Sequence, residues 1–133
     1  MAGPLEKAIY TRLTGFSALT TLLASSTSVW AVLASPSETL PYIVYRTFDE
    51  SPNDVMSTAT TPTEAAIQVS AFAVTHQAMV DITTQIKAAF NRWSATSDGV
   101  VIQDTFYDGF NERFDPVDSV YTRDHDFRFF YEE

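Results

Sequence analysis

The sequence predicts an α+β domain in which short N-terminal helices and one long helix pack on a mainly antiparallel sheet. Three observations indicate this fold class. Apolar residues recur every three or four positions in residues 5–13 and 76–93, as they do along one face of a helix. In residues 64–73 and 119–131 they alternate with other residues, as in half-buried strands. Short turn sequences connect neighbouring strands, which favours antiparallel pairing. The 133 residues match the length of one domain, and we expect residues 1–133 to form a single one.

Two short helices are expected at the N-terminus. Pro4 suits the first turn of a helix, because its missing N–H would have no partner there in any case. The apolar stripe of this helix consists of Leu5, Ile9 and Leu13. Gly15 ends the helix, and Ser17 is expected to cap a second, short helix in ALTTLLA. The segment VWAVLA, residues 29–34, is expected to be extended.

Two strands and a long loop follow. Residues 40–50, LPYIVYRTFDE, are expected to form the first of these two strands, and Pro41 belongs at its start or on a sheet edge because it has no N–H to donate. Residues 64–73, EAAIQVSAFA, alternate as a half-buried strand. The loop between them, residues 51–63, is longer than most hairpin connections. We therefore expect a hairpin with a long tip.

The longest helix is expected to run from Thr75 to about Trp93. Thr75 is a good N-cap, because its hydroxyl can accept a hydrogen bond from an N–H of the first turn. The apolar face of this helix consists of Met79, Ile82, Ile86, Ala89, Phe90 and Trp93. This face is expected to cover the sheet.

Turns at residues 97–99, 108–111 and 115–116 separate two further strands, residues 100–106 and 119–131. In the last strand one face carries Tyr121, His125, Phe127, Phe129 and Tyr131, and the other carries Thr122, Asp124, Asp126 and Arg128. The predicted order of elements is therefore α-α-β-β-β-α-β-β.

The charge of the chain argues against some classes of partner. Eight basic and 17 acidic residues give a net charge of -9, which repels nucleic acid phosphates and anionic lipid. Residues 97–133 hold ten acids and three bases, a net charge of -7, whereas residues 1–96 hold seven acids and five bases, a net charge of -2. This uneven charge either serves solubility or forms an acidic working surface. Residues 18–34 are too polar for a signal peptide or a membrane span, so no membrane partner is expected.

The two histidines do not predict a metal site. His76 lies in the first turn of a helix, where a solvated surface position is expected. His125 lies between Asp124 and Asp126, but neighbours along a strand point to opposite faces, so the three side chains do not converge on one ion. The chain has no cysteine, which excludes a thiolate metal site.

No catalytic motif is present, and we expect a protein that is not an enzyme and binds no cofactor. Asp104 and Asp108 could form a carboxylate pair for acid–base chemistry, but two acids among 17 carry little weight. A cluster of aromatic residues near the C-terminus either stacks nucleic acid bases or forms sheet core, and the nearby acids favour the core. These residues are Phe127, Phe129, Phe130 and Tyr131.

The long loop is a candidate partner contact. Val55 and Met56 are the only bulky apolar residues in its polar run. Either the loop has no functional consequence, or it becomes ordered against a partner with these two residues as anchors. The candidate interface residues are Asp49, Glu50, Asn53, Asp54, Val55 and Met56.

Taken in order, these segments resemble the tail-completion proteins of long-tailed bacteriophages, also called tail terminators or tail-to-head joining proteins. The resemblance covers nearly the whole chain. It consists of LEKAIYTRL, FSALTTLLA, LPYIVYRTFDE, AAIQVSAFAVTHQAMVDITTQIKAAF and the ending YTRDHDFRFFYEE. Residues 29–34 and the stretch DGFNERFDPVDS depart from the family pattern, so those regions are expected to be remodelled.

The resemblance implies a structural virion protein at the head–tail interface, made in the host cytoplasm. Six subunits would form a ring on the tail tube protein, stop tube growth and join the head-completion or connector protein. DNA would pass through the ring lumen without specific binding. The resemblance also suggests roles for two sets of residues. The loop would lie at an axial or neighbour contact, and the acids Asp104, Asp108, Asp124 and Asp126 are the candidates for facing the lumen.

Three other functions stay open from the sequence. A head-completion stopper would belong to the same particle. A tube protein would also belong to it but would polymerise without limit. A small ligand-binding α+β domain would instead have a concave polar pocket.

Overall fold

The computed structural model describes residues 4–25, 28–31, 40–52, 63–97, 99–117 and 119–132. Within these residues the chain forms three helices and six strands. The helices are α1 (Pro4–Gly15), α2 (Ser17–Thr20) and α3 (His76–Phe90). The strands are β1 (Val29–Ala31), β2 (Tyr42–Pro52), β3 (Thr63–Ala73), β4 (Ala95–Ser97), β5 (Val100–Asp115) and β6 (Val120–Glu132). The predicted α+β class is confirmed.

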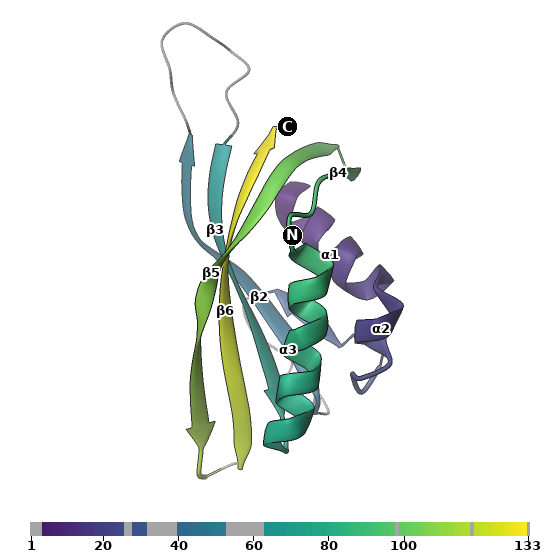
Figure 1. The fold of residues 1–133 in the computed structure, drawn as a ribbon, viewed down its shortest axis with the longest axis vertical. Coiled ribbons are helices and arrows are strands. Elements are labelled where there is room, and N and C mark those ends of the chain that lie inside the picture. Colours follow the sequence, from purple (N-terminus) through teal and green to yellow (C-terminus); the bar gives the residue numbers. More distant parts are fainter. Residues whose placement is uncertain are drawn as a thin grey trace, which may run out of the picture.

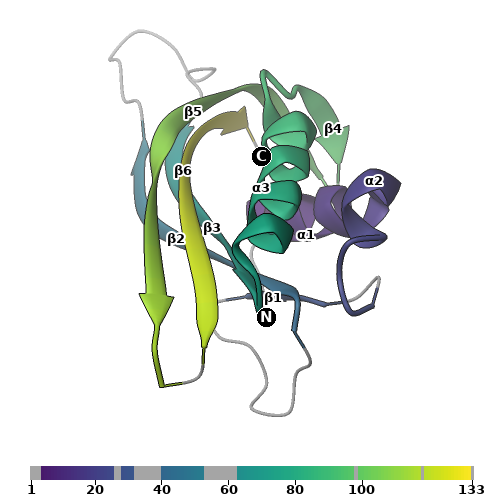
Figure 2. The same cartoon turned by 60° about the horizontal axis from the view of Figure 1, so that its bottom comes forward.

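The strands form one mixed sheet in the order β1-β2-β3-β6-β5-β4. β1 runs parallel to β2, whereas the four other pairs of neighbours are antiparallel. The sheet is strongly twisted, and the three helices lie on one of its faces (Figure 1). A second view shows β5 and β6 as a long curved hairpin beside α3 (Figure 2). None of the described helices covers the opposite face, which we call the bare face.

The core lies between α3 and the sheet. The predicted apolar face of α3 is buried from Met79 to Phe90, and Trp93, just after the helix, packs against the same core. Phe90 is its centre, because its ring lies 5.4 Å from the rings of both Phe127 and Phe129. Thr75 caps the helix as expected, since its hydroxyl accepts a hydrogen bond from the Ala78 N–H.

Helix α1 packs on this core through its predicted stripe of Leu5, Ile9 and Leu13, all of which are buried. Its C-terminal turn is tied to the end of α3, because Arg12 Nε donates a hydrogen bond of 2.9 Å to the carbonyl oxygen of Ala89. In the described part of the chain, no helix is long and apolar enough to cross a membrane.

The predicted cap of α2 is wrong. The N-cap residue is Phe16, which is extended and makes no side-chain cap hydrogen bond, and Ser17 is the first helical residue. The helix ends at Thr20, so it is only one turn long. Of the predicted extended stretch, residues 29–31 form β1, and residues 32–34 lie outside the described residues.

The predicted turn at residues 108–111 is also wrong. β5 continues through it to Asp115, paired with β6 throughout, and the register shifts between Tyr107 and Gly109. Gly109 has φ +129°, a backbone conformation that glycine adopts readily and that suits a β-bulge. The Asp-Gly pair therefore bends a strand here instead of ending it. β4, a three-residue edge strand, was not predicted from the sequence.

Candidate assembly surfaces

The bare face is identified by the strand register, because side chains alternate between the two faces of a sheet. One row across it consists of Val44, Ser70, Asp124 and Asn111. The next row consists of Arg46, Gln68, Asp126 and Gly109. A third row, nearer the tip of the β5–β6 hairpin, consists of Tyr42, Phe72, Thr122 and Arg113. The face is thus mainly polar and charged, with a stacked aromatic pair, Tyr42 and Phe72, near one end.

The four acids proposed for the lumen, Asp104, Asp108, Asp124 and Asp126, all lie on this side of the sheet. Each of the first three is paired with an arginine, and Arg128, the partner of Asp108, also binds Glu64 at 3.4 Å. Asp104 binds Arg92, Asp108 binds Arg128 at 2.9 Å, and Asp124 binds Arg113 at 3.1 Å. The hydrogen bond from Arg92 also lowers the pKa of Asp104. Asp126 differs, because among the described residues its contact is a 3.4 Å hydrogen bond from Gln68 Nε2.

Asp124 is the most buried of these acids. Only 8% of its side chain is exposed, and it accepts hydrogen bonds from Ser70 Oγ and from Arg113. Asp104 and Asp108 bind different arginines, so they do not form a shared acid–base pair. Sequence reasoning missed these arginines, since Arg92, Arg113 and Arg128 lie 11 to 20 residues from the acids that they bind.

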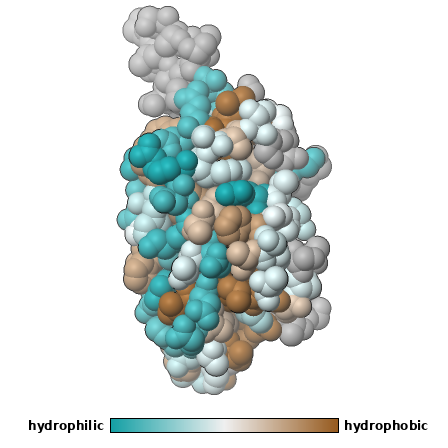
Figure 3. Space-filling model, turned by 45° about the vertical axis from the view of Figure 1, so that its right-hand side comes forward, coloured by the Kyte–Doolittle hydropathy of each residue, from teal (hydrophilic) through white to brown (hydrophobic). Residues whose placement is uncertain are grey.

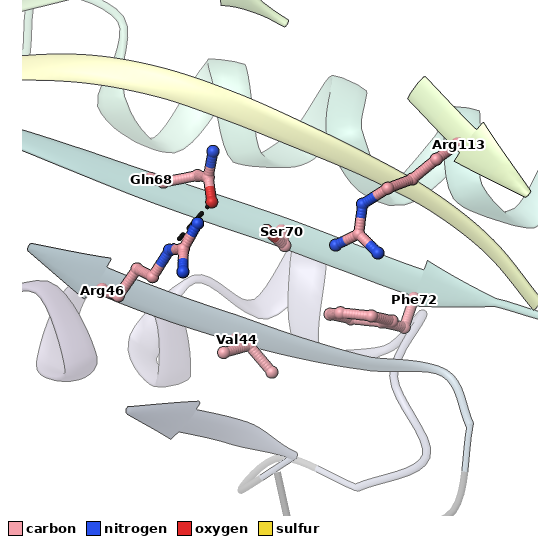
Figure 4. Close-up of a pocket in the computed structure, with 6 residues that line it drawn as sticks. All are labelled: Val44, Arg46, Gln68, Ser70, Phe72 and Arg113. Atoms are coloured by element: carbon pink, nitrogen blue, oxygen red, sulfur yellow. Dashed lines mark hydrogen bonds between the residues drawn. The ribbon is translucent and has the colours of Figure 1, made fainter. Parts of the chain in front are cut away.

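A shallow pocket of about 100 Å³ opens on the bare face. Its lining consists of Val44, Arg46, Gln68, Ser70, Phe72 and Arg113. Figure 4 shows the two arginines on opposite sides of β3, with Ser70 and Phe72 between them. Arg46 Nε donates a 3.0 Å hydrogen bond to Gln68, and Arg46 forms no ion pair with any described residue. The pocket offers polar contacts but little enclosed volume.

His125 lies on the helix-covered face, opposite Asp124 and Asp126, as the alternation predicts. It is fully buried, and its Nδ1 lies 3.0 Å from the hydroxyl oxygen of Tyr107, while Nε2 has no hydrogen-bond partner in the described structure. Burial, followed by the charges of Arg123 and Lys87, lowers the pKa of His125 to about 4. His76 is exposed, with Nε2 3.7 Å from a carboxylate oxygen of Glu112. Across the described ranges, no three His, Cys, Asp or Glu side chains are placed to hold a metal ion.

The C-terminal aromatic residues divide between the two faces of the sheet. Phe127, Phe129 and Tyr131 are buried in the core, which confirms their predicted role. Phe130 lies on the other side, where its ring packs edge-on against Phe106. These rings therefore do not form one exposed stacking platform.

Several large hydrophobic side chains are exposed on the described surface. They are Leu22, Val74, Val101, Phe110, Phe114 and Val117. The last three belong to the β5–β6 hairpin, which extends past the helices (Figure 2). On the side that bears the helices, hydrophobic patches are separated by hydrophilic ones (Figure 3).

The predicted loop is shorter than expected, because residues 51–52 belong to β2 and Thr63 to β3. Asp49 and Glu50 lie in β2, paired with Ala66 and Ala65. Asn53, Asp54, Val55 and Met56 lie outside the described residues, so their role in partner binding stays a prediction.

Comparison with known proteins agrees with the resemblance seen in the sequence. A solved structure titled "Virion of native gene transfer agent (GTA) particle" contains a chain with the same fold. The TM-score is 0.76 at 16% sequence identity, over 98% of this chain and 96% of that chain. No curated protein matches the sequence. The model of the family described as "Tail completion protein gp17" matches residues 7–132. With nearly its whole length matched, the chain belongs to the tail completion protein gp17 family.

Proposed function

We propose that this virion structural protein is a tail terminator that acts as a single domain. Six copies would form a ring on the last ring of the tail tube, stop its growth and present a surface to the head-completion or connector protein. DNA would pass through the lumen without specific binding. The protein would be made in the host cytoplasm and would end at the head–tail interface of the virion.

The observation that carries this proposal is the division of the sheet into a helix-covered face and a bare face. A subunit of a ring around DNA needs a wall that faces the duplex without holding it. On the bare face the carboxylates slightly outnumber the arginines: Glu64, Asp104, Asp108, Asp124 and Asp126 stand against Arg46, Arg92, Arg113 and Arg128. Asp104, Asp108 and Asp124 are each held by an arginine of the same chain. A weakly acidic wall with fixed side chains would repel phosphates without trapping them. We therefore propose that the bare face lines the lumen.

A small ligand-binding function is less well supported. The pocket between Arg46 and Arg113 holds about 100 Å³, and another beside Phe114 holds about 260 Å³. Both are smaller than typical small-molecule sites of roughly 300–1,000 Å³. The remaining alternatives, a stopper and a tube protein, differ from a terminator in how they assemble.

The mass of the purified protein tests the proposal. Light scattering after size exclusion would be measured over a range of concentrations, with and without tail tubes. A terminator is expected to form a closed hexamer, either alone or as one ring at each tube end. Open-ended filaments would indicate a tube protein, and a monomer that ignores tubes would contradict a terminator.

The lumen assignment predicts that Asp126→Lys makes the ring bind DNA. Asp126 is the best position for this test, because no described arginine holds it and the change breaks no ion pair in the described residues. Six added lysines that face the duplex are expected to raise the affinity of the ring for duplex DNA at low salt by about tenfold or more. This affinity is expected to depend steeply on salt.

Filter binding of purified rings would measure this effect. Asp81→Lys is the matched control, since Asp81 is an exposed acid on α3, away from the bare face. Equal DNA affinity of the two variants would show that the bare face does not face the lumen.

A further inference from the structure

Among the described strands, none pairs with the outer edge of β5 over most of its length. β4 pairs only with residues 100–102, and no described strand pairs with this side of β5 from residue 106 to residue 115. An unpaired edge presents a row of backbone N–H and C=O groups, which is a template for another strand. The free edge continues along the hairpin that extends past the helices (Figure 2).

Two of the side chains along this edge, Phe110 and Phe114, are apolar and exposed, among charged and polar neighbours such as Glu112 and Arg113. Phe110 and Phe114 point to the helix-covered side of the sheet but are 53% and 47% exposed. Arg123 lies over the ring of Phe110 at 4.4 Å, and Phe114 packs against Tyr121 at 4.6 Å, so both rings are held in place. Proteins commonly protect a free edge with charges, proline or a β-bulge. β5 has a bulge at Gly109, but beyond it the inward charge of Glu112 is bound by Arg123 and the two aromatic rings on either side of it stay exposed. Two exposed aromatic rings beside a long strand edge without a described partner strand are typical of an edge that another chain covers.

The same sheet carries a second long free edge. β1 pairs with residues 43–45 of β2, and beyond them residues 46–52 of β2 have no described partner on their outer side. A closed ring joins each subunit to its neighbours through two different surfaces, one on each side. The edges of β5 and β2 are two such surfaces, and both can form main-chain hydrogen bonds.

We propose that β5, from residue 106 to residue 115, pairs with the outer edge of β2 in a second copy of this chain, with Phe110 and Phe114 buried in the seam. This inference rests on the proposed ring and names the contact that closes it. Repeated around the ring, the pairing joins the sheets of neighbouring subunits, and their bare faces form one continuous wall.

Substitution of Phe110 tests the seam. Phe110→Asp is expected to raise the concentration needed for assembly at least about tenfold, with or without tail tubes, because a charge would enter an apolar contact. Val101→Asp is the matched control, since Val101 is 43% exposed on the same strand where β4 already pairs with it. Circular dichroism and thermal melting would show that both variants fold. If Phe110→Asp forms rings at the same concentration as the wild-type protein, the inference is overturned.

Cysteine crosslinking tests the choice of β2, and the wild-type chain has no cysteine to interfere. Asn111 lies on the bare-face side of β5, and the β2 test positions are Asp49 and Ser51, whose backbone pairs with Ala66 and Glu64 of β3. Asn111→Cys combined with Asp49→Cys or Ser51→Cys is expected to give disulfide-linked oligomers up to a hexamer. Asn111→Cys with Gln77→Cys, on α3, is expected to give none.

The outcomes separate the two proposals. If the wild-type protein forms no ring with tail tubes, the proposed function fails. If the wild-type ring forms but neither β2 pair crosslinks, the ring stands and the strand pairing is wrong.

Discussion

Replacing Phe90 with alanine is expected to lower the free energy of unfolding by about 3–5 kcal/mol. Phe90 is fully buried where α3 meets the sheet, and its ring contacts those of Trp93, Phe127 and Phe129. Removal of the ring loses its transfer free energy and leaves a cavity that the neighbouring rings fill only in part. Because a domain is stable by only about 5–15 kcal/mol, this single change is expected to bring the chain close to unfolding.

Urea denaturation followed by tryptophan fluorescence would measure the loss. Val74→Ala is a suitable control, since Val74 is 58% exposed and its truncation is expected to change stability by no more than about 0.5 kcal/mol. A loss for Phe90→Ala that is as small as the control's would show that the aromatic cluster is not the centre of the core.

The elements that the sequence predicts well are those with a long, regular pattern. In α3 the apolar residues from Met79 to Phe90 follow the helical period, and a good capping residue precedes them. In β6 the alternation holds along the whole strand, so the faces of His125 and Asp124 were both predicted correctly. Local periodicity was sufficient in these two elements because each lies against a single continuous core.

Local signals failed where pairing with a distant strand decides the structure. Asp108 and Gly109 are typical turn residues, yet β6 pairs with β5 on both sides of them and turns the signal into a bulge. β4 has only three residues, too few for a period to be recognised, and it exists because β5 offers it an edge. Ser17 is a good capping residue, but Phe16 takes the N-cap position of this one-turn helix.

In the candidate site, too, local patterns predicted the face on which a side chain lies but not the distant residues that it contacts. Alternation placed Asp124 and Asp126 on one face of β6, but it could not show that Arg113 crosses from β5 to neutralise Asp124. Ser70 and Asp124 are 54 residues apart in the chain and become neighbours only through the β3–β6 register. The many acids of the sequence were therefore a poor guide to the net charge of the bare face. The arginines that bind these acids come from distant parts of the chain.

Acidification is expected to destabilise the folded protein through His125. The pKa of His125 is lowered to about 4 in the folded chain, mainly by burial, with further lowering by Arg123 and Lys87 and a smaller opposing effect of Asp124. Its ordinary value in the unfolded chain is about 6.5. Between these values the unfolded chain binds a proton that the folded chain does not, so stability rises with pH in this window. The contribution of His125 to stability is therefore full above pH 6.5 and falls as the pH approaches 4, by about 3 kcal/mol in total.

The test compares wild type with His125→Phe, because the many carboxylates also titrate in this range and affect both proteins alike. Phenylalanine has a similar size and would lie among Tyr107, Phe110 and Phe127, whose rings surround His125. The difference in unfolding free energy between the two proteins is expected to change by about 3 kcal/mol between pH 7 and pH 4, with the variant gaining on wild type as the pH falls. His76→Gln is the control, since His76 is exposed and its environment changes less on folding. Parallel stability profiles for wild type and His125→Phe would show that His125 takes up its proton as readily in the folded chain as in the unfolded one.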